Sequence, residues 1–168
     1  MITANRHVVV KKKDGEFYVT IEELGSDTKT VTLPAKRWAA LVAAEAQIDH
    51  AVHSLQAKQC VKFNQHIGGG YFVSVTSGYS CVDIREFYFN KDQGTPRATK
   101  HGIALILAQW PTFKEIIQQI KQHFPKLSKT EVCAHHNMDT LINCIECHPF
   151  KDSMDTLKPV SEPNYSFY

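Results

Sequence analysis

Cysteine and histidine side chains gather in the last quarter of the chain, where their types are those that bind zinc. Cys133 and His135 are followed by Cys144 and Cys147, which form a Cys-x-x-Cys pair with His148 beside it. Four thiolate or imidazole ligands complete a structural zinc site. However, the spacing matches no standard zinc finger, and an amphipathic stretch runs through it. Reduced cysteines acting as small apolar groups are therefore the favoured interpretation over zinc.

Catalytic chemistry has little support in the sequence. A thiol enzyme built on Cys147 would need a base and an orienting acid in recognisable order, and none is evident. Gly68-Gly69-Gly70 lacks the following Gly-Lys-Ser/Thr of a phosphate-binding loop, so we interpret it as a hinge. The sequence thus predicts a protein that is not an enzyme and has no metal or cofactor.

Composition places the chain among globular proteins. It has 168 residues, of which 43% are hydrophobic and 21% charged, and its five cysteines are an odd number. An odd number excludes a complete intramolecular disulfide framework and favours reduced thiols. No apolar run approaches the roughly 20 residues of a membrane-spanning helix. The first residues lack the layout of a signal peptide, so we expect a cytoplasmic or nuclear protein without a membrane partner.

Charge is distributed unevenly along the chain. Residues 1–57 have 7 basic and 7 acidic side chains, residues 58–132 have 10 and 5 (net +5), and residues 133–168 have 2 and 5 (net −3). A basic middle suits a surface that binds polyanions, and an acidic end could partly mask it. An ordinary solvated surface explains the same distribution equally well.

The first third of the chain predicts strands followed by one long helix. Asp14-Gly15 separates two β-rich runs, and this dipeptide is a strong hairpin signal because glycine tolerates positive φ. Residues 28–33 alternate with period two and predict a third strand. Pro34 then suits the first turn of a helix that runs to about Gln56, with Trp38 and Leu41 on its apolar face.

The middle of the chain repeats this order of elements. Residues 71–75 and 80–89 predict strands, residues 90–100 a loop, residues 102–105 a short strand and residues 109–123 a helix. The spacing of Val31, Leu33 and Trp38 is that of Ile103, Leu105 and Trp110. We interpret the match as an imperfect internal duplication. The predicted modules are residues 1–57 and 58–127, with a Cys/His-containing tail at 128–168.

Residues 61–123 resemble the single-stranded-DNA-binding domain of the transcriptional coactivator family positive cofactor four. The resemblance is carried by residues 71–75 (YFVSV), 82–88 (VDIREFY) and 102–105 (GIAL), with Gln109-Trp110 after them. It implies an α+β fold in which each ββββα-like module has a curved antiparallel sheet. The family's domain is dimeric, so the duplicated chain is expected to pack its helices together as an intramolecular pseudo-dimer.

The resemblance also implies a binding surface. Arg85 takes the place of a strand arginine that faces nucleic acid, Tyr88 replaces a tryptophan, and Tyr79 is near a stacking aromatic. Lys100 and Arg97 fall where the family has basic loop residues. Lysines common in the family's first hairpin are missing here, and the first module has lysines in the equivalent hairpin, with an aromatic beside them. These candidates are Lys11, Lys12, Lys13 and Phe17.

Single strands need cations along the phosphates and flat rings for the bases, and a sheet can supply both. The alternation of Val82 and Ile84 does not place Arg85 easily, so a bulge or strong curvature is expected nearby. We expect a nuclear protein that binds single-stranded DNA, or alternatively RNA, and contacts the transcription machinery, as a pseudo-dimeric monomer or as a homodimer. The alternatives are a protein-interaction adaptor that keeps the fold and a zinc-dependent factor built around the tail.

Overall fold

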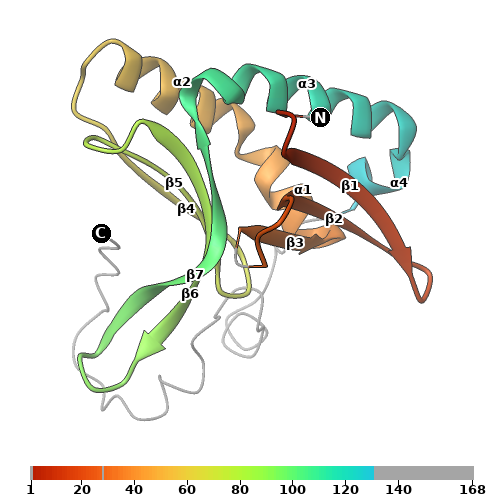
Figure 1. Ribbon diagram of the computed structural model, residues 1–168, viewed down its shortest axis with the longest axis horizontal. Helices are drawn as coiled ribbons and strands as arrows, with labels where there is room; N and C mark the ends of the chain where they lie inside the picture. The colour runs from red at the N-terminus through yellow and green to blue at the C-terminus, as the bar shows by residue number, and fades with distance from the viewer. Residues whose placement is uncertain (1, 28, 131–168) are drawn as a thin grey trace.

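The computed structural model describes residues 2–27 and 29–130, which form an α+β fold with two antiparallel sheets. The first sheet has the order β1-β2-β3 and the second the order β4-β5-β6-β7. Figure 1 shows the helices on one side of both sheets. The strands are β1 (Arg6–Lys13), β2 (Glu16–Glu23), β3 (Thr30–Pro34), β4 (Lys62–Gly68), β5 (Tyr71–Thr76), β6 (Cys81–Asn90) and β7 (Thr95–Ile106). The helices are α1 (Ala35–Ala43), α2 (Glu45–Gln56), the 3-10 turn η1 (Leu107–Gln109), α3 (Trp110–His123) and α4 (Pro125–Ser128).

The hairpin predicted at Asp14-Gly15 is confirmed. Both turn residues have positive φ, 52° at Asp14 and 85° at Gly15, and Lys13 pairs with Glu16 across them. Positive φ at both central residues defines the type I′ turn, whose twist matches that of the flanking strands. The turn therefore sets the register of β1 against β2.

The single helix expected from Pro34 to Gln56 is in fact two helices. Ala44 lies between α1 and α2 with φ −87° and ψ −3°, which bends the chain without a proline or glycine. As a result α1 contacts β2, β3 and β4, whereas α2 contacts β4 and β5. The bend lets one continuous segment cover parts of both sheets.

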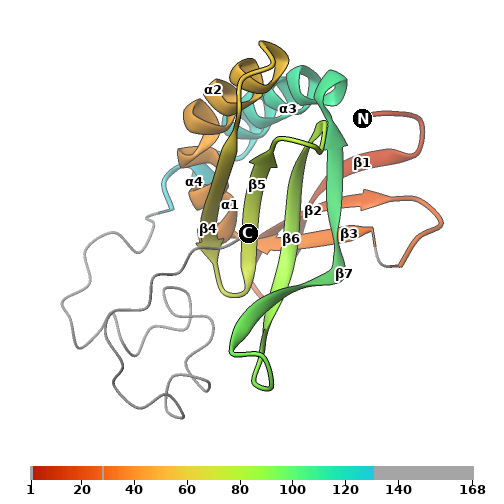
Figure 2. The same cartoon turned by 90° about the vertical axis from the view of Figure 1, so that its left-hand side faces the viewer.

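The second sheet corrects two further expectations. Residues 95–100, predicted as part of a loop, belong to β7, where Pro96 is tolerated because β7 is an edge strand. Gly68-Gly69-Gly70 is not a hinge between modules but joins β4 to β5 within one sheet. Figure 2 shows the four strands side by side, with the β6–β7 hairpin projecting beyond the ends of β4 and β5.

Strand pairing follows the same pattern in both sheets. In the first sheet Val19 pairs with Leu33 and Ile21 with Val31. In the second sheet Val82 pairs with Leu105 and Ile84 with Ile103, so the two hydrophobic pairs recur in the same order. Val8 lies opposite Ile21, just as Val73 lies opposite Ile84. By this pairing β1, β2 and β3 correspond to β5, β6 and β7.

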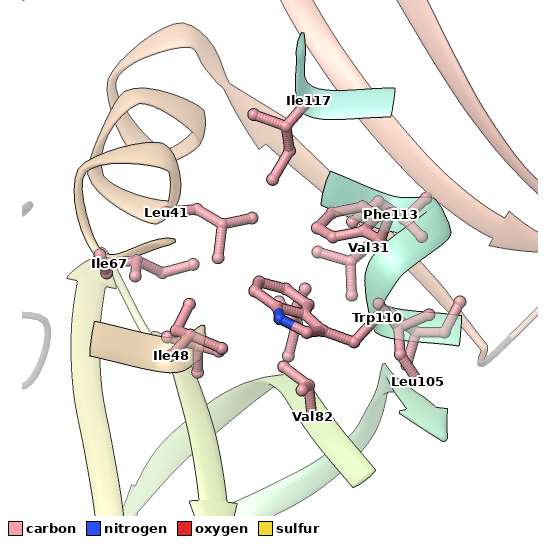
Figure 3. Packing of buried hydrophobic residues seen from close by; sticks show 14 of the residues in the cluster. Val31, Leu41, Ile48, Ile67, Val82, Leu105, Trp110, Phe113 and Ile117 are labelled. Atoms are coloured by element: carbon pink, nitrogen blue, oxygen red, sulfur yellow. The ribbon is translucent and has the colours of Figure 1, made fainter. Parts of the chain in front are cut away.

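One hydrophobic core joins the two sheets and the helices. Trp38 of α1 and Phe113 of α3 meet edge to face with their ring centroids 6.2 Å apart, and both side chains are buried. Figure 3 shows residues of this core that come from α1, α2, α3 and both sheets. Burying such aromatic side chains is a large part of what stabilises a fold of this size. In the described ranges no helix combines the length and apolar character needed to cross a membrane.

Candidate nucleic-acid interface

The face of the second sheet that points away from the helices gathers polar, basic and aromatic side chains. Because successive side chains of a strand alternate, burial of Val73, Val75, Val82 and Ile84 in the core leaves their neighbours on the opposite face. We call this the outer face of the second sheet. It comprises Lys62, Asn64, His66, Phe72, Ser74, Thr76, Cys81, Asp83, Arg85 and Phe87.

Arg85 is held firmly in the middle of this outer face. Its Nε and Nη2 each donate to a carboxylate oxygen of Asp83 at 3.1 Å, and Nη1 donates to the carbonyl of Thr99 at 3.0 Å. The arginine side chain retains 23% of its exposure. A guanidinium has five N–H donors. Three of them are used within the described structure, so two remain for an incoming ligand. Arg85 is thus a pre-positioned, partly exposed cation.

Gly102 makes room for the Arg85 side chain. A Cβ atom at position 102 would lie only 2.8 Å from the Arg85 Cγ and 2.9 Å from its Cβ. Contacts this short force one of the two residues to move. The glycine that follows the basic stretch of β7 therefore allows the arginine to lie flat across its neighbouring strand.

The irregularity expected near Arg85 is confirmed. Pairing of β6 with β7 shifts between Arg85 and Phe87, so that three residues of β7 lie opposite one of β6. Thr99 closes this bulge, because its hydroxyl donates to the Glu86 carbonyl at 2.9 Å and accepts the His101 N–H at 3.1 Å. Lys100 is exposed at the bulge, and bulges commonly redirect side chains in this way.

Aromatic residues differ in what they offer a nucleic acid. Phe72 is 4% exposed and packs against the rings of His66 and Phe87, at 4.9 and 5.2 Å between centroids, so its ring is not available for stacking. Tyr79 is 70% exposed in the turn between β5 and β6, and Tyr88 is 51% exposed. The exposed tyrosines are the rings on which unpaired bases could stack.

Tyr88 and Arg97 form a separate part of the candidate site. They are paired on the projecting β6–β7 hairpin, and Arg97 donates a hydrogen bond to Gln93. Alternation places them on the side of the hairpin opposite Phe87. The structure therefore does not bring these two residues onto the outer face with Arg85.

The first sheet divides its candidate residues between two faces. Lys11 and Lys13 share a face with Tyr18, which lies directly opposite Lys11. Lys12 and Phe17 point to the helix side, where the lysine ammonium is 5.6 Å from the Phe17 ring centroid. Phe17 itself packs edge to face on Phe124 at 5.8 Å. The face with Lys11, Lys13 and Tyr18 is the outer face of the first sheet.

Two polar contacts join residues 1–57 to residues 58–127. Arg6 of β1 donates to the Ala104 carbonyl at 2.6 Å and to Gln109 Oε1 at 3.0 Å, and its hydrogen bond to Glu23 lowers the pKa of that carboxyl. In the second contact, the guanidinium of Arg37 in α1 lies 5.4 Å from the ring centroid of Tyr71 in β5.

A third polar contact joins α2 to α3. Asp49 Oδ1 accepts from the Lys114 ammonium at 2.7 Å and from Trp110 Nε1 at 3.0 Å. These bonds, chiefly the one from Lys114, lower the pKa of Asp49.

Metal ligands do not cluster in the described residues: no group of three or more His, Cys, Asp or Glu side chains is suitably placed. Cys60 and Cys81 are free thiols, and burial raises the pKa of Cys81. The Cys133, His135, Cys144 and Cys147 set lies outside the described residues.

Tyr18 and Lys62 were not predicted as site residues. Tyr18 could have been found from the alternation of Val19 and Ile21, which sends it to the face of Lys11. Lys62 lies in β4, a strand with no alternating pattern strong enough to reveal its exposed outer position.

Two comparisons with known proteins each give a transcriptional coactivator. Similarity to a protein of Caenorhabditis elegans named "Putative RNA polymerase II transcriptional coactivator" amounts to 36% identity over 52 residues. These residues are 31% of this chain and 42% of that protein, so the chain matches less than half of the relative's length. No solved structure matches. The segment from Phe72 to Ile116, which forms β5 to β7 and the first half of α3, matches the family model described as Transcriptional Coactivator p15 (PC4).

Proposed function

We propose that this protein binds single-stranded nucleic acid, with little sequence preference, on the outer faces of its sheets, in support of transcription in the nucleus. The observation that carries the proposal is Arg85, which lies within the segment that matches the coactivator domain. It is fixed by Asp83 and Thr99 and still has donors to spare. Cations of this kind follow phosphates, whereas exposed rings accept bases of any sequence.

Further cations and rings extend this surface. Lys62 and Lys100 are exposed near the outer face of the second sheet, and Tyr79 stands at its hairpin end. The outer face of the first sheet adds Lys11 and Lys13, with Tyr18 directly opposite Lys11. We propose these residues as the interface, with Tyr88 and Arg97 as a separate contact on the projecting hairpin.

We further propose that the chain is a duplicated pseudo-dimer. The matched registers of β2–β3 and β6–β7 support it. Reciprocal contacts support it too: the residue before Trp110 meets the first residue of β1, and the residue before Trp38 meets the first residue of β5. Such exchange of equivalent contacts is what a two-fold interface produces. The buried Trp38–Phe113 contact would then be the internal equivalent of a dimer core.

The direct test is fluorescence anisotropy with labelled oligo-dT at 50 and 200 mM salt, with duplex DNA as competitor. The proposal expects salt-sensitive binding that duplex does not displace, because neutralising several phosphates releases counterions. Absence of binding at 50 mM salt would reject it, and the adaptor alternative would take its place. Sedimentation in the same buffer tests the pseudo-dimer, which predicts binding by a 19.0 kDa monomer.

A further inference from the structure

The two sheets differ in strand number at one particular edge. β5 pairs with β6 on one side and with β4 on the other. β1, which holds the corresponding place in the first sheet, pairs with β2, and no described strand lies on its other side. The first sheet therefore ends where the second sheet has a fourth strand.

The backbone of β1 has hydrogen-bonding groups directed to this open edge. In an antiparallel pair, residues alternate between those that bond to the partner strand and those that do not. The two-residue turn makes Lys13 and Glu16 a bonded pair. Counting back in steps of two, residues 11, 9 and 7 bond to β2, so the N–H and C=O groups of Val8, Val10 and Lys12 point away from it.

In the second sheet the equivalent strand, β5, has a further strand, β4, paired to its outer edge. Val73 and Val75 of β5 correspond to Val8 and Val10, and they pair with Gln65 and Phe63 of β4. Both valines of β5 have no exposed surface. Val8 and Val10 are only partly buried, so the absence of a neighbouring strand leaves apolar surface uncovered.

A groove lies beside this edge. It has a volume of about 310 Å³, and it separates β1 from the C-terminal half of α3. Five apolar and two polar residues line it, and none has a carboxylate: Val8, Val10, Ile116, Gln119, Ile120, His123 and Phe124. Val8 and Val10 thus have backbone groups directed outward and side chains that line the groove.

We propose that this edge binds an extended acidic segment of a partner protein as a fourth strand. Apolar side chains at alternate positions of the segment fill the groove, and its main chain bonds to Val8 and Val10. Lys11, Lys12 and Lys13 are exposed at one end of the edge and make no ion pair within the described structure. Asp14 and Glu16 nearby offset part of this charge, and a carboxylate-bearing strand complements the remainder.

A second copy of β1 is a poor occupant of the same place. Antiparallel pairing of two β1 strands would set the lysines of each opposite Arg6 and His7 of the other. Like charges directly opposite one another destabilise a sheet. The groove lies on the helix side of β1, so the apolar and main-chain part of this site is separate from the outer faces proposed for nucleic acid, and the two sites share Lys11 and Lys13.

Proline substitution gives a selective test. Val10→Pro removes an outward N–H and leaves the bonds between β1 and β2 in place, which edge strands tolerate. Asn64→Pro is the matched control on β4. The Val61 carbonyl accepts a hydrogen bond from the Ser77 N–H, so residues 61, 63 and 65 bond toward β5. The N–H and C=O groups of Asn64 therefore point away from β5, as those of Val10 point away from β2. The probe is a fluorescein-labelled peptide of alternating glutamate and valine, seven residues long, and its lysine-for-glutamate version is the charge control.

The full-length chain should bind the acidic peptide saturably and ignore the basic one. Val10→Pro should weaken binding at least tenfold, while Asn64→Pro should not change it. Circular dichroism of both variants and oligo-dT binding of Val10→Pro should match the parent, which separates this result from any failure of the nucleic-acid proposal. Equal binding by Val10→Pro, or loss with Asn64→Pro, would overturn the proposal. Strong hydrogen-exchange protection of the Val10 amide without peptide would also overturn it, because it would show that this chain or a second copy already covers the edge.

Discussion

Replacing Arg85 by alanine removes the cation on which the proposed interface depends. Arg85 uses three N–H groups on Asp83 and Thr99 and keeps two for a phosphate. A charge-assisted hydrogen bond contributes about 1.5–3 kcal/mol. Its loss should therefore weaken oligo-dT binding by roughly ten- to a hundredfold. The variant also leaves the Asp83 carboxylate unpaired on the same face, where it repels phosphate.

Salt dependence distinguishes a phosphate contact from a change in folding. Each phosphate neutralised on a single strand contributes about 0.7 to the slope of log affinity against log salt. Arg85→Ala should lower that slope by about this amount, as measured by anisotropy from 50 to 200 mM salt. Gly102→Ala should act in the same direction, because its Cβ would displace the arginine side chain. If Arg85→Ala leaves both affinity and slope unchanged while the protein stays folded, Arg85 does not contact the nucleic acid.

Three further predictions follow from side chains described above. Lys11→Ala with Lys13→Ala should lower the salt slope by about 1.4, whereas Lys12→Ala should leave it unchanged because Lys12 lies on the helix side over Phe17; equal effects would contradict the assignment of faces. Tyr79→Ala should weaken oligo-dT binding by about 1–3 kcal/mol if bases stack on it, with an unchanged melting temperature because the ring is 70% exposed. Asp49→Asn should lower the free energy of unfolding by about 0.5–1 kcal/mol at pH 7, since the ion pair is partly exposed. Because folding lowers the pKa of Asp49, this difference should be complete above the ordinary pKa of 3.8 and disappear as the pH falls through the lowered value; urea unfolding at pH 7 and below pH 3 measures it.

Local sequence signals predicted the elements of this fold where turn chemistry and alternation agree. Asp14-Gly15 gives the first hairpin because both residues tolerate the positive φ of a type I′ turn, and burial of Val19 and Ile21 follows from their alternation. The break at Ala44 was not predictable, since alanine favours helix and the bend depends on packing against two sheets.

The candidate site was less predictable than the fold. Pro96 and Gly94 indicate a loop, yet pairing with β6 extends β7 through Thr95 and Pro96, because an edge strand has no need of every N–H. The resemblance indicated Phe17 as the aromatic residue that accompanies the hairpin lysines. The pairing of β1 with β2 shows instead that Tyr18 is the ring on the same face as Lys11. The facing of side chains is a tertiary property, and neighbours in sequence are on opposite faces of a strand.

The single core that joins both sheets has a consequence for behaviour at low concentration. An obligate homodimer loses its shared core on dilution, because its stability depends on the concentration of protomers. Here Trp38 and Phe113 belong to one polypeptide, so dilution cannot separate them. The relative placement of the two outer faces is therefore a property of each molecule, the same in a very dilute solution as in a concentrated preparation.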